Sequence, residues 1–368
     1  MICSARETSS PFGIVFVKKE ALLPSRHGLL LALCSAVAVL AMVVQDSARA
    51  ADATLIDAAK KQGEVTWYTT QIIDQFARPA AEAFENKYGI KVNYVRADAS
   101  DSALRILNEA RAGKVQADLF DGIAAPALVK EGAVLDYVPE SAQRLPPQFV
   151  DPQHFWVATN LYVYTLGFNT ELVPKGTEPK SYEDLLDPKW KGKMAWSSRS
   201  STTSAPGFVG IVLAAMGETK GRAYLDALAK QNITPLTVSV RQVLDEVIAG
   251  EYSIGLQILN NHAAISAAQG APVAWTSLQP SMAVLNVLSM TKAAPHPDAG
   301  KLFFDFLVSS EGQKLYRDAD YIPVDPDVPP RDASLRPDGD KLKAVYFSPQ
   351  EVEDQLATWT KIYNEKFR

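Results

Sequence analysis

The chain has 368 residues, 47% of them hydrophobic, which is enough to bury a large core and to form about two domains. Its formal net charge is −5, and no run of basic residues occurs along it. This excludes nucleic acid as an expected partner and argues against a polybasic contact with a membrane surface.

The first 50 residues have the pattern of a secretory signal peptide. Arg26 and His27 precede an uncharged apolar run at 28–44, and Ala48-Arg49-Ala50 provides the small residues of a cleavage site. The run is roughly 17 residues long, near the lower limit for a membrane-spanning helix, so an uncleaved anchor is the alternative. We expect residues 1–50 to be removed on export.

Both cysteines, Cys3 and Cys34, lie in the segment that we expect to be removed. The mature chain would have no disulfide and no thiolate metal site, and its stability would depend on a hydrophobic core. The segment holds five basic and three acidic residues, so its loss changes the net charge from −5 to −7.

Residues 64–95 predict a strand, a helix and a second strand. Apolar residues at three- and four-residue spacing at 73–88 predict a helix that ends at Gly89. Strands connected through a helix are usually parallel, and ligands bind beyond the carboxyl ends of such strands. Thr69, Thr70 and Gln71 occupy this position and would either contact ligand or serve as turn residues.

The alternation of strands and helices continues at 100–132. A helix is expected at 100–112, with Asp101 or Ser102 as its cap, and a short strand at 117–120. Asp121 follows that strand and would either bind an ammonium or hydroxyl group or cap the next helix. This repeat predicts a doubly wound α/β layer.

The remaining elements follow from the same patterns. Ser239 and Gln242 have capping-box spacing at the start of one helix. Strands are expected at 155–168, 194–196, 252–259 and 283–290, and helices at 181–186, 207–216, 221–231, 239–249, 299–307 and most of 340–368.

Several short segments follow one another along the chain in a recognisable order: Val65-Thr-Trp-Tyr-Thr69, Ala117-Asp-Leu-Phe120, Leu166-Gly-Phe-Asn169, Asp187-Pro-Lys-Trp-Lys-Gly-Lys193, Gly250-Glu-Tyr-Ser-Ile-Gly255 and Ser310-Glu-Gly-Gln313. Together they resemble the periplasmic solute-binding proteins of ABC importers, in the group that includes ferric-ion-binding proteins. The resemblance covers nearly all of the chain after residue 50. It implies an α/β fold of two lobes, joined by a hinge of crossing strands, with ligand held in the cleft between the lobes.

The resemblance also implies a domain division. Lobe one would comprise residues 51–162 and 285–330, and lobe two residues 163–284, with the helical segment at 331–368 packed on lobe two. The implied location is the periplasm, and the implied partners are a small-molecule ligand and an ABC permease in the membrane. The protein is expected to be a monomer without a cofactor.

The ferric members of the group hold iron through a histidine, a glutamate and two adjacent tyrosines. The corresponding positions carry Ile72, a residue near Ile123, and the pair Asn260 and Asn261. Ferric iron prefers anionic oxygen ligands, for which neutral amides are poor substitutes. We therefore expect no metal; a different site, formed by Asp121, Tyr162 and His262, is the alternative.

A serine-rich loop at 197–204, SSRSSTTS, precedes an apolar helix. Hydroxyl groups, free amides and the helix dipole together favour an anion there. The resemblance assigns phosphate or carboxylate binding to this loop, and the alternative is a loop that only caps the helix. The candidates are Arg199, which would add a bidentate contact or remain solvated, and Ser201, Thr202, Thr203 and Ser204.

Four further polar residues are candidate ligand contacts. Asn260 and Asn261 can each donate and accept hydrogen bonds. Arg241 lies in the first turn of a helix, an unfavourable place for a cation, which suggests that it points to ligand or to solvent. Tyr162 shares a strand face with Tyr164 and would stack on a ligand or pack in the core.

The chain contains no G-x-S-x-G, H-E-x-x-H or P-loop motif, so no enzyme is expected. With the resemblance, the sequence predicts an exported substrate-binding protein that captures a small polar organic anion, such as a phosphonate, a sugar phosphate or a carboxylate. A protein for a metal or metal–anion complex is one alternative, and a periplasmic ligand-sensor subunit is another.

Overall fold

The structure is a computed structural model that describes residues 53–199, 204–337 and 341–368. Residues 55–368 form one compact unit. The expected signal peptide at 1–50 lies outside the described residues. In the part of the chain that is described, no helix combines the length and apolar character needed to span a membrane.

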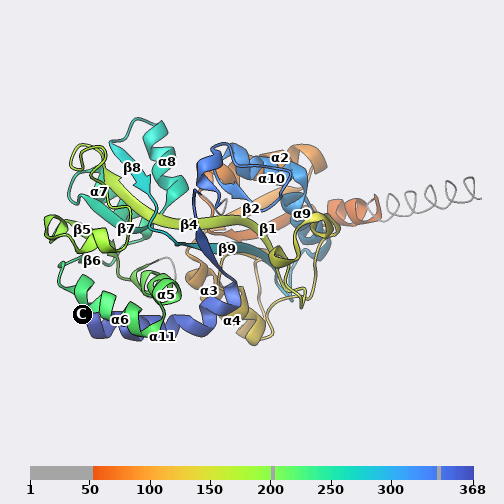
Figure 1. The fold of residues 1–368 in the computed structure, drawn as a ribbon. Coiled ribbons are helices and arrows are strands. Elements are labelled where there is room, and N and C mark those ends of the chain that lie inside the picture. The colour runs from red at the N-terminus through yellow and green to blue at the C-terminus, as the bar shows by residue number, and fades with distance from the viewer. Residues whose placement is uncertain (1–52, 200–203, 338–340) are drawn as a thin grey trace, which may run out of the picture. The chain divides into compact units, whose positions relative to one another are not determined.

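The described strands form one mixed sheet of eleven strands (Figure 1). Its main path runs β2 (Lys91–Arg96), β1 (Glu64–Thr69), β3 (Leu119–Asp121), β9 (Ser281–Met290), β4 (Val157–Asn169), β7 (Ile254–Leu259), β5 (Met194–Ser197) and β6 (Thr234–Leu236). Three strands pair outside this path: β8 (Val273–Thr276) and β10 (Ile322–Pro323) with β4, and β11 (Ala344–Phe347) with β9.

Two parallel layers occupy the ends of this sheet. β1 pairs in parallel with β2 and β3, whereas β5 pairs in parallel with β6 and β7. Between the layers, β4 runs antiparallel to β9 and to β7, and every residue of β4 and β9 is buried. The expected α/β class is confirmed, and β4 and β9 are the long strands that cross between the layers (Figure 1).

Helices cover the sheet, and their bounds are close to those predicted from periodicity. They are residues 53–62, α2 (Arg78–Tyr88), α3 (Ala99–Arg111), α4 (Ala125–Lys130), α5 (Ala205–Met216), α6 (Glu218–Ala229), α7 (Val240–Ile248), α8 (Asn260–Ala268), α9 (Pro297–Val308), α10 (Ser310–Asp318) and α11 (Pro349–Phe367). The predicted capping box of Ser239 and Gln242 is present at the start of α7. A π-helical turn at Ile73–Ala77 replaces the first turn of the expected helix before α2.

The C-terminal segment packs on α5 and α6. Trp359 and Tyr363 are buried, Trp196 contacts Tyr363 edge-on, and Lys366 forms an ion pair with Asp226 of α6. The segment differs from the prediction in one respect, because residues 344–347 form a strand rather than helix. Their sequence, AVYF, suits a strand, and the edge of β9 provides a partner that no local pattern reveals.

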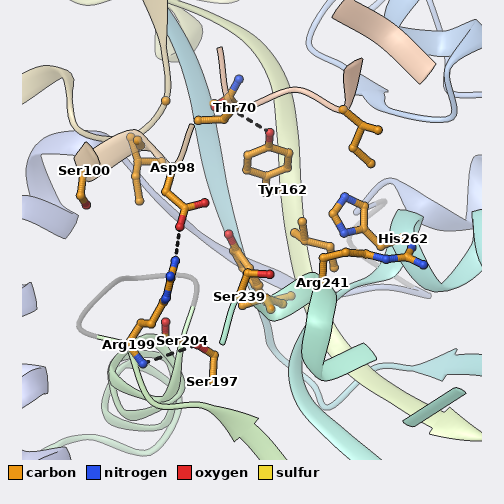
Figure 2. A pocket seen from close by; sticks show the side chains of 18 of the residues that line it. Thr70, Asp98, Ser100, Tyr162, Ser197, Arg199, Ser204, Ser239, Arg241 and His262 are labelled. Atoms are coloured by element: carbon orange, nitrogen blue, oxygen red, sulfur yellow. Dashed lines mark hydrogen bonds and ion pairs between the residues drawn. The ribbon is translucent and has the colours of Figure 1, made fainter. Parts of the chain in front are cut away.

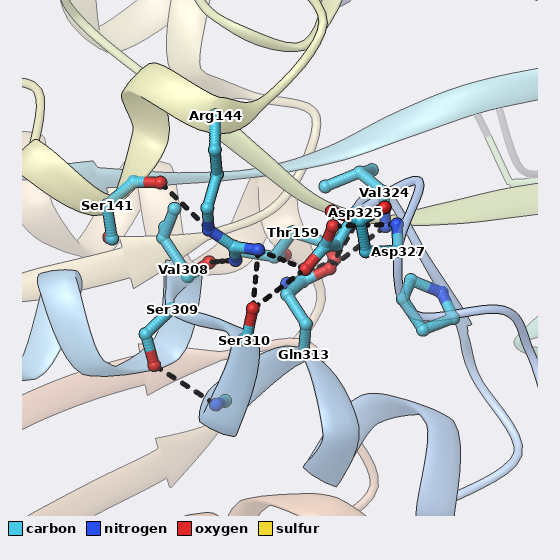
Figure 3. A network of polar contacts seen from close by, with 12 residues as sticks. Ser141, Arg144, Thr159, Val308, Ser309, Ser310, Gln313, Val324, Asp325 and Asp327 are labelled. Atoms are coloured by element: carbon cyan, nitrogen blue, oxygen red, sulfur yellow. Dashed lines mark hydrogen bonds and ion pairs between the residues drawn. The ribbon is translucent and has the colours of Figure 1, made fainter.

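A polar network around Arg144, Gln313 and Asp325 connects α10 to β4 (Figure 3). Gln313 on α10 donates to the Thr159 carbonyl at 3.0 Å and accepts from the amides of Val324 and Asp325. Asp325 is buried and forms an ion pair with Arg144, which also donates to the Val308 carbonyl at 2.6 Å. Within this network, the buried side chains of Gln313 and Asp325 therefore have partners.

Candidate functional site

A cavity of about 320 Å³ lies at the carboxyl ends of the parallel strands, in the size range of small-molecule sites. Thr70 follows β1, Arg96 ends β2, Gly122 follows β3 and Ser197 ends β5, and all four line the cavity. Residues of both parallel layers therefore meet at one site, at the switch point where open sheets bind ligands (Figure 2).

Three guanidinium groups line the cavity. Arg241 donates to Ser266 Oγ at 3.0 Å and to Asp245 at 2.8 Å, which holds its side chain in place. Arg199 forms an ion pair with Asp98, which lies at the start of α3 (Figure 2). Arg96 lines the cavity too and forms no ion pair among the described residues. Among the described residues, the lining carboxylates are Asp98 and Asp101, so the three arginines leave an excess of positive charge.

His262 is a neutral group among these cations. Its side chain lines the cavity and is 9% exposed, and Nδ1 has no hydrogen-bond partner among the described residues. Burial, followed by the nearby charges of Arg241 and Arg96, lowers the pKa of His262 to about 3. The imidazole is therefore uncharged at neutral pH and can both donate and accept.

Asp121 is buried behind Thr70, at 1% exposure. It accepts hydrogen bonds from Thr69 Oγ1 at 2.5 Å, from the Thr70 amide at 2.9 Å and from the Thr70 hydroxyl. Burial raises the pKa of Asp121, although these hydrogen bonds act against that rise. The carboxylate is thus committed to the turn that follows β1.

Five of the residues predicted from sequence line the cavity: Thr70, Tyr162, Arg199, Ser204 and Arg241. Three more, Ser201, Thr202 and Thr203, lie outside the described residues. The remaining five are at most 1% exposed and do not line it: Thr69, Gln71, Asp121, Asn260 and Asn261.

Strand alternation and hydrogen bonds to distant parts of the chain account for the burial of several of these five residues. Side chains alternate along an extended chain, so Thr70 faces the cavity while Thr69 and Gln71 face the interior. Gln71 donates to Asn160 Oδ1 at 3.1 Å, and Asn260 donates to the Leu335 carbonyl at 2.8 Å. These five residues lie in the layer behind the lining of the cavity, and as ligand contacts they remain predictions.

Other residues that line the cavity were not predicted from the sequence, among them Arg96, Asp98, Ser239, Asn286 and Tyr321. Arg96 was detectable in principle, as a cation at the carboxyl end of a parallel strand. Asp98 is the N-cap residue of α3, where Asp101 or Ser102 was expected, but its side chain makes no capping bond. It pairs with Arg199 instead, a contact between residues 101 positions apart.

The cavity offers few ligands to a metal ion. Among the described residues, no three His, Cys, Asp or Glu side chains are grouped to hold one. Ile72 and Ile123 line the cavity, while Asp121 is separated from Tyr162 and His262 by its position behind Thr70. Burial raises the pKa of Tyr162 well above its ordinary value, so the phenol is protonated at neutral pH.

Two parallel layers, two crossing strands and a polar cavity between them define a ligand-binding protein of the two-lobed periplasmic type. Residues 79–364 match the family described as bacterial extracellular solute-binding protein, and the chain belongs to this family. The expected family and two-lobed fold are confirmed. The family's proteins serve transport by binding solutes.

Relatives and solved structures agree with this assignment. A putative 2-aminoethylphosphonate-binding periplasmic protein of Salmonella typhimurium is 25% identical over 287 residues, 73% of this chain and 77% of that protein. The periplasmic binding protein AfuA of Actinobacillus pleuropneumoniae, solved with fructose-6-phosphate, has a TM-score of 0.71 at 22% identity, over 83% of this chain and 98% of its own. Iron-bound HitA of Pseudomonas aeruginosa has a TM-score of 0.68 at 22% identity, over 81% and 99%.

Proposed function

We propose that this protein captures a small organic anion in the cavity and delivers it to an ABC permease. The observation that carries the proposal is the excess of guanidinium groups around a cavity of about 320 Å³. Arginine binds phosphate, phosphonate and carboxylate groups with two parallel hydrogen bonds. The neutral His262 adds a donor without requiring a proton from solvent.

Ser204, the N-cap residue of the 12-residue helix α5, lines the anion site. Ser197 and Ser239 also line the cavity, but their hydroxyl protons are donated to the Val238 carbonyl at 2.6 Å and to Gln242 Oε1 at 3.0 Å, so the arginines and the helix N-terminus supply the donors for an anion. A helix N-terminus favours an anion through its free amides and its dipole. Ser201, Thr202 and Thr203 remain predicted contacts in the same loop.

The names of relatives support a phosphorus oxyanion as the ligand class. One relative is named for 2-aminoethylphosphonate, and one solved structure holds fructose-6-phosphate. We propose a phosphonate or sugar phosphate first and a carboxylate second. The protein would act as a periplasmic monomer after cleavage behind Ala50, with lobe one at 51–162 and 285–330, lobe two at 163–284, and 331–368 packed on lobe two.

Isothermal titration of the refolded protein with phosphonates, sugar phosphates and carboxylates tests this proposal. Arg241→Gln is expected to weaken binding roughly 10- to 100-fold, because a hydrogen-bonded charge is lost. Arg222→Gln is the matched control, since Arg222 forms the same i,i+4 ion pair, with Glu218, on the outer helix α6. Equal affinities of both variants and the wild type would contradict the proposal.

Iron is the second candidate ligand, since Tyr162, Tyr164 and Tyr321 line the cavity and HitA was solved with iron. Direct ferric binding by a phenolate produces a visible absorption band. We expect no such band after ferric loading. A strong band that Tyr162→Phe abolishes would show that the ligand is iron and not an organic anion.

A further inference from the structure

The hydroxyl proton of Thr70 is committed to Asp121. A threonine hydroxyl has one proton to donate, and its closest acceptor is Asp121 Oδ1, which also accepts from the Thr70 amide at 2.9 Å. The other oxygens near Thr70 Oγ1 are more distant, at 3.4 Å for Tyr162 Oη and 3.5 Å for Asn286 Oδ1. The Thr70 oxygen therefore turns lone pairs, not a proton, toward the cavity.

The same constraint sets the direction of the Tyr162 phenol. Because the Thr70 proton is taken, Tyr162 is the donor in their contact at 3.4 Å. Its own oxygen then also presents lone pairs to the cavity. We call Thr70 and Tyr162 the acceptor corner. Asn286 lines the cavity beside it and donates from Nδ2 to Asn160 Oδ1 at 3.1 Å, while Asp121 is buried behind Thr70.

The acceptor corner and the cationic groups come from different elements. Thr70 follows β1 and Tyr162 lies on β4, whereas Arg199 follows β5 and Arg241 lies in the first turn of α7. Figure 2 shows Thr70 and Tyr162 together, with both arginines well apart from them. Arg199 and Arg241 thus attract anions, and Thr70 and Tyr162 attract hydrogen-bond donors. The third lining arginine, Arg96, ends β2 in the same layer as Thr70, in register with Thr69.

We propose that the ligand carries a hydrogen-bond donor, an ammonium or a hydroxyl group, in addition to its anionic group, and that this donor binds at the acceptor corner. The inference rests on the proposed function, because it takes the anion to bind the arginines. Asp121 is the positioning residue: it does not touch the ligand but fixes Thr70 as an acceptor. Its buried negative charge adds attraction for an ammonium group.

Three probes with the same anion and carbon chain test this inference: ethylphosphonate, 2-hydroxyethylphosphonate and 2-aminoethylphosphonate. In the wild type, we expect each donor-bearing probe to bind about tenfold more tightly than ethylphosphonate, the effect of one good hydrogen bond. Thr70→Val removes the acceptor and should reduce this ratio to about one, while Thr70→Ser, which keeps the hydroxyl, should preserve it. The affinities of the probes are compared as ratios, because a loss of affinity that is common to all three probes cancels in the ratio.

Asp121→Asn tests the positioning role. Removal of the buried charge should reduce the advantage of 2-aminoethylphosphonate more than that of 2-hydroxyethylphosphonate. Asp118→Asn is the matched control: Asp118 is an equally buried carboxylate just before β3, it accepts from the Thr66 amide at 2.7 Å, and it does not line the cavity. Its ratios should equal those of the wild type, and circular dichroism verifies the folding of each variant.

The outcomes separate this inference from the proposed function. If ethylphosphonate binds as tightly as the other two probes, the donor subsite is wrong and anion capture stands. If the wild type prefers donors but Thr70→Val keeps that preference, the donor binds elsewhere, for example at Asp101, and the acceptor corner is overturned. If no phosphonate, sugar phosphate or carboxylate binds, both proposals fall.

Discussion

The ionisation of His262 is strongly displaced by its surroundings. Its pKa is lowered to about 3 because the buried imidazole would have to carry a charge next to Arg241 and Arg96. An unfolded chain has no such restriction and binds a proton near pH 6.5. Between about pH 3 and pH 6.5, His262 therefore binds a proton in the unfolded state but not in the folded state. Its contribution to the stability of the folded state is lost as the pH falls from about 6.5 toward 3.

We predict that His262→Asn flattens the acid limb of the stability curve. The expected difference from the wild type is up to about 1.4 kcal/mol per pH unit between pH 6 and pH 4, measured by denaturant unfolding at each pH. His154→Asn is the control, because His154 is exposed and has a left-handed backbone that asparagine tolerates. The contribution of Asp121 to stability has the opposite pH dependence, because its raised pKa favours folding at low pH. Asp121 is present in both variants, so this contribution does not affect the comparison. Identical acid limbs for His262→Asn and the wild type would contradict the prediction.

At the scale of elements, the contact between α5 and α11 depends on one glycine. A Cβ atom on Gly210 would lie 2.6 Å from Cε2 of Trp359, too close for any real contact. The absence of a side chain lets the indole of α11 rest directly on the backbone of α5. This close approach fixes the C-terminal helix, together with the capping box of Ser348 and Glu351.

We predict that Gly210→Ala destabilises the protein by about 1–3 kcal/mol, because the overpacking of Trp359 outweighs the gain in helix propensity. Gly300→Ala is the matched control: it also lies within a helix, but its Cβ would meet the flexible end of Met290 at 3.1 Å. Guanidinium unfolding should show a clear loss for the first variant and little change for the second. Equal effects would mean that the contact with Trp359 is not limiting.

For the whole molecule, the ion pair of Arg199 and Asp98 connects the two parallel layers across the cavity. Both side chains are about half exposed, so the pair contributes at most about 1 kcal/mol and is weakened by salt. We expect the two lobes to open and close about the crossing strands. A free energy of about 1 kcal/mol would change the ratio of open to closed molecules roughly fivefold, so the pair would bias the ligand-free protein without locking it.

We predict that Asp98→Asn increases the radius of gyration of the ligand-free protein in small-angle scattering, and that saturating ligand restores the wild-type value. High salt should have the same effect on the wild type. Asp101→Asn, which removes a lining carboxylate that has no ion pair among the described residues, is the control. Scattering curves that do not differ between the variants at low salt would show that the ion pair has no part in closure.

Much of this molecule could be predicted from its sequence, because the signals are local. Hydrophobic spacing revealed most helices and strands, Ser239 and Gln242 revealed a capping box, and the order of short segments revealed the family. Each depends on residues within a few positions of one another, and such patterns survive without knowledge of the fold. The expected signal peptide at 1–50 is also such a pattern.

The composition of the site was decided by tertiary structure. The turn at 69–71 was polar throughout, yet strand alternation turned Thr70 to the cavity and Thr69 and Gln71 inward. Arg199 forms an ion pair with Asp98, and Asn260 donates a hydrogen bond to the Leu335 carbonyl. Both contacts join residues that are far apart in the chain. The sequence by itself determined that an α/β binding protein would present polar groups at the ends of its strands. Only the packing of the two layers decided which of these polar side chains face a ligand, because the direction and the partners of a side chain depend on the long-range pairing of strands.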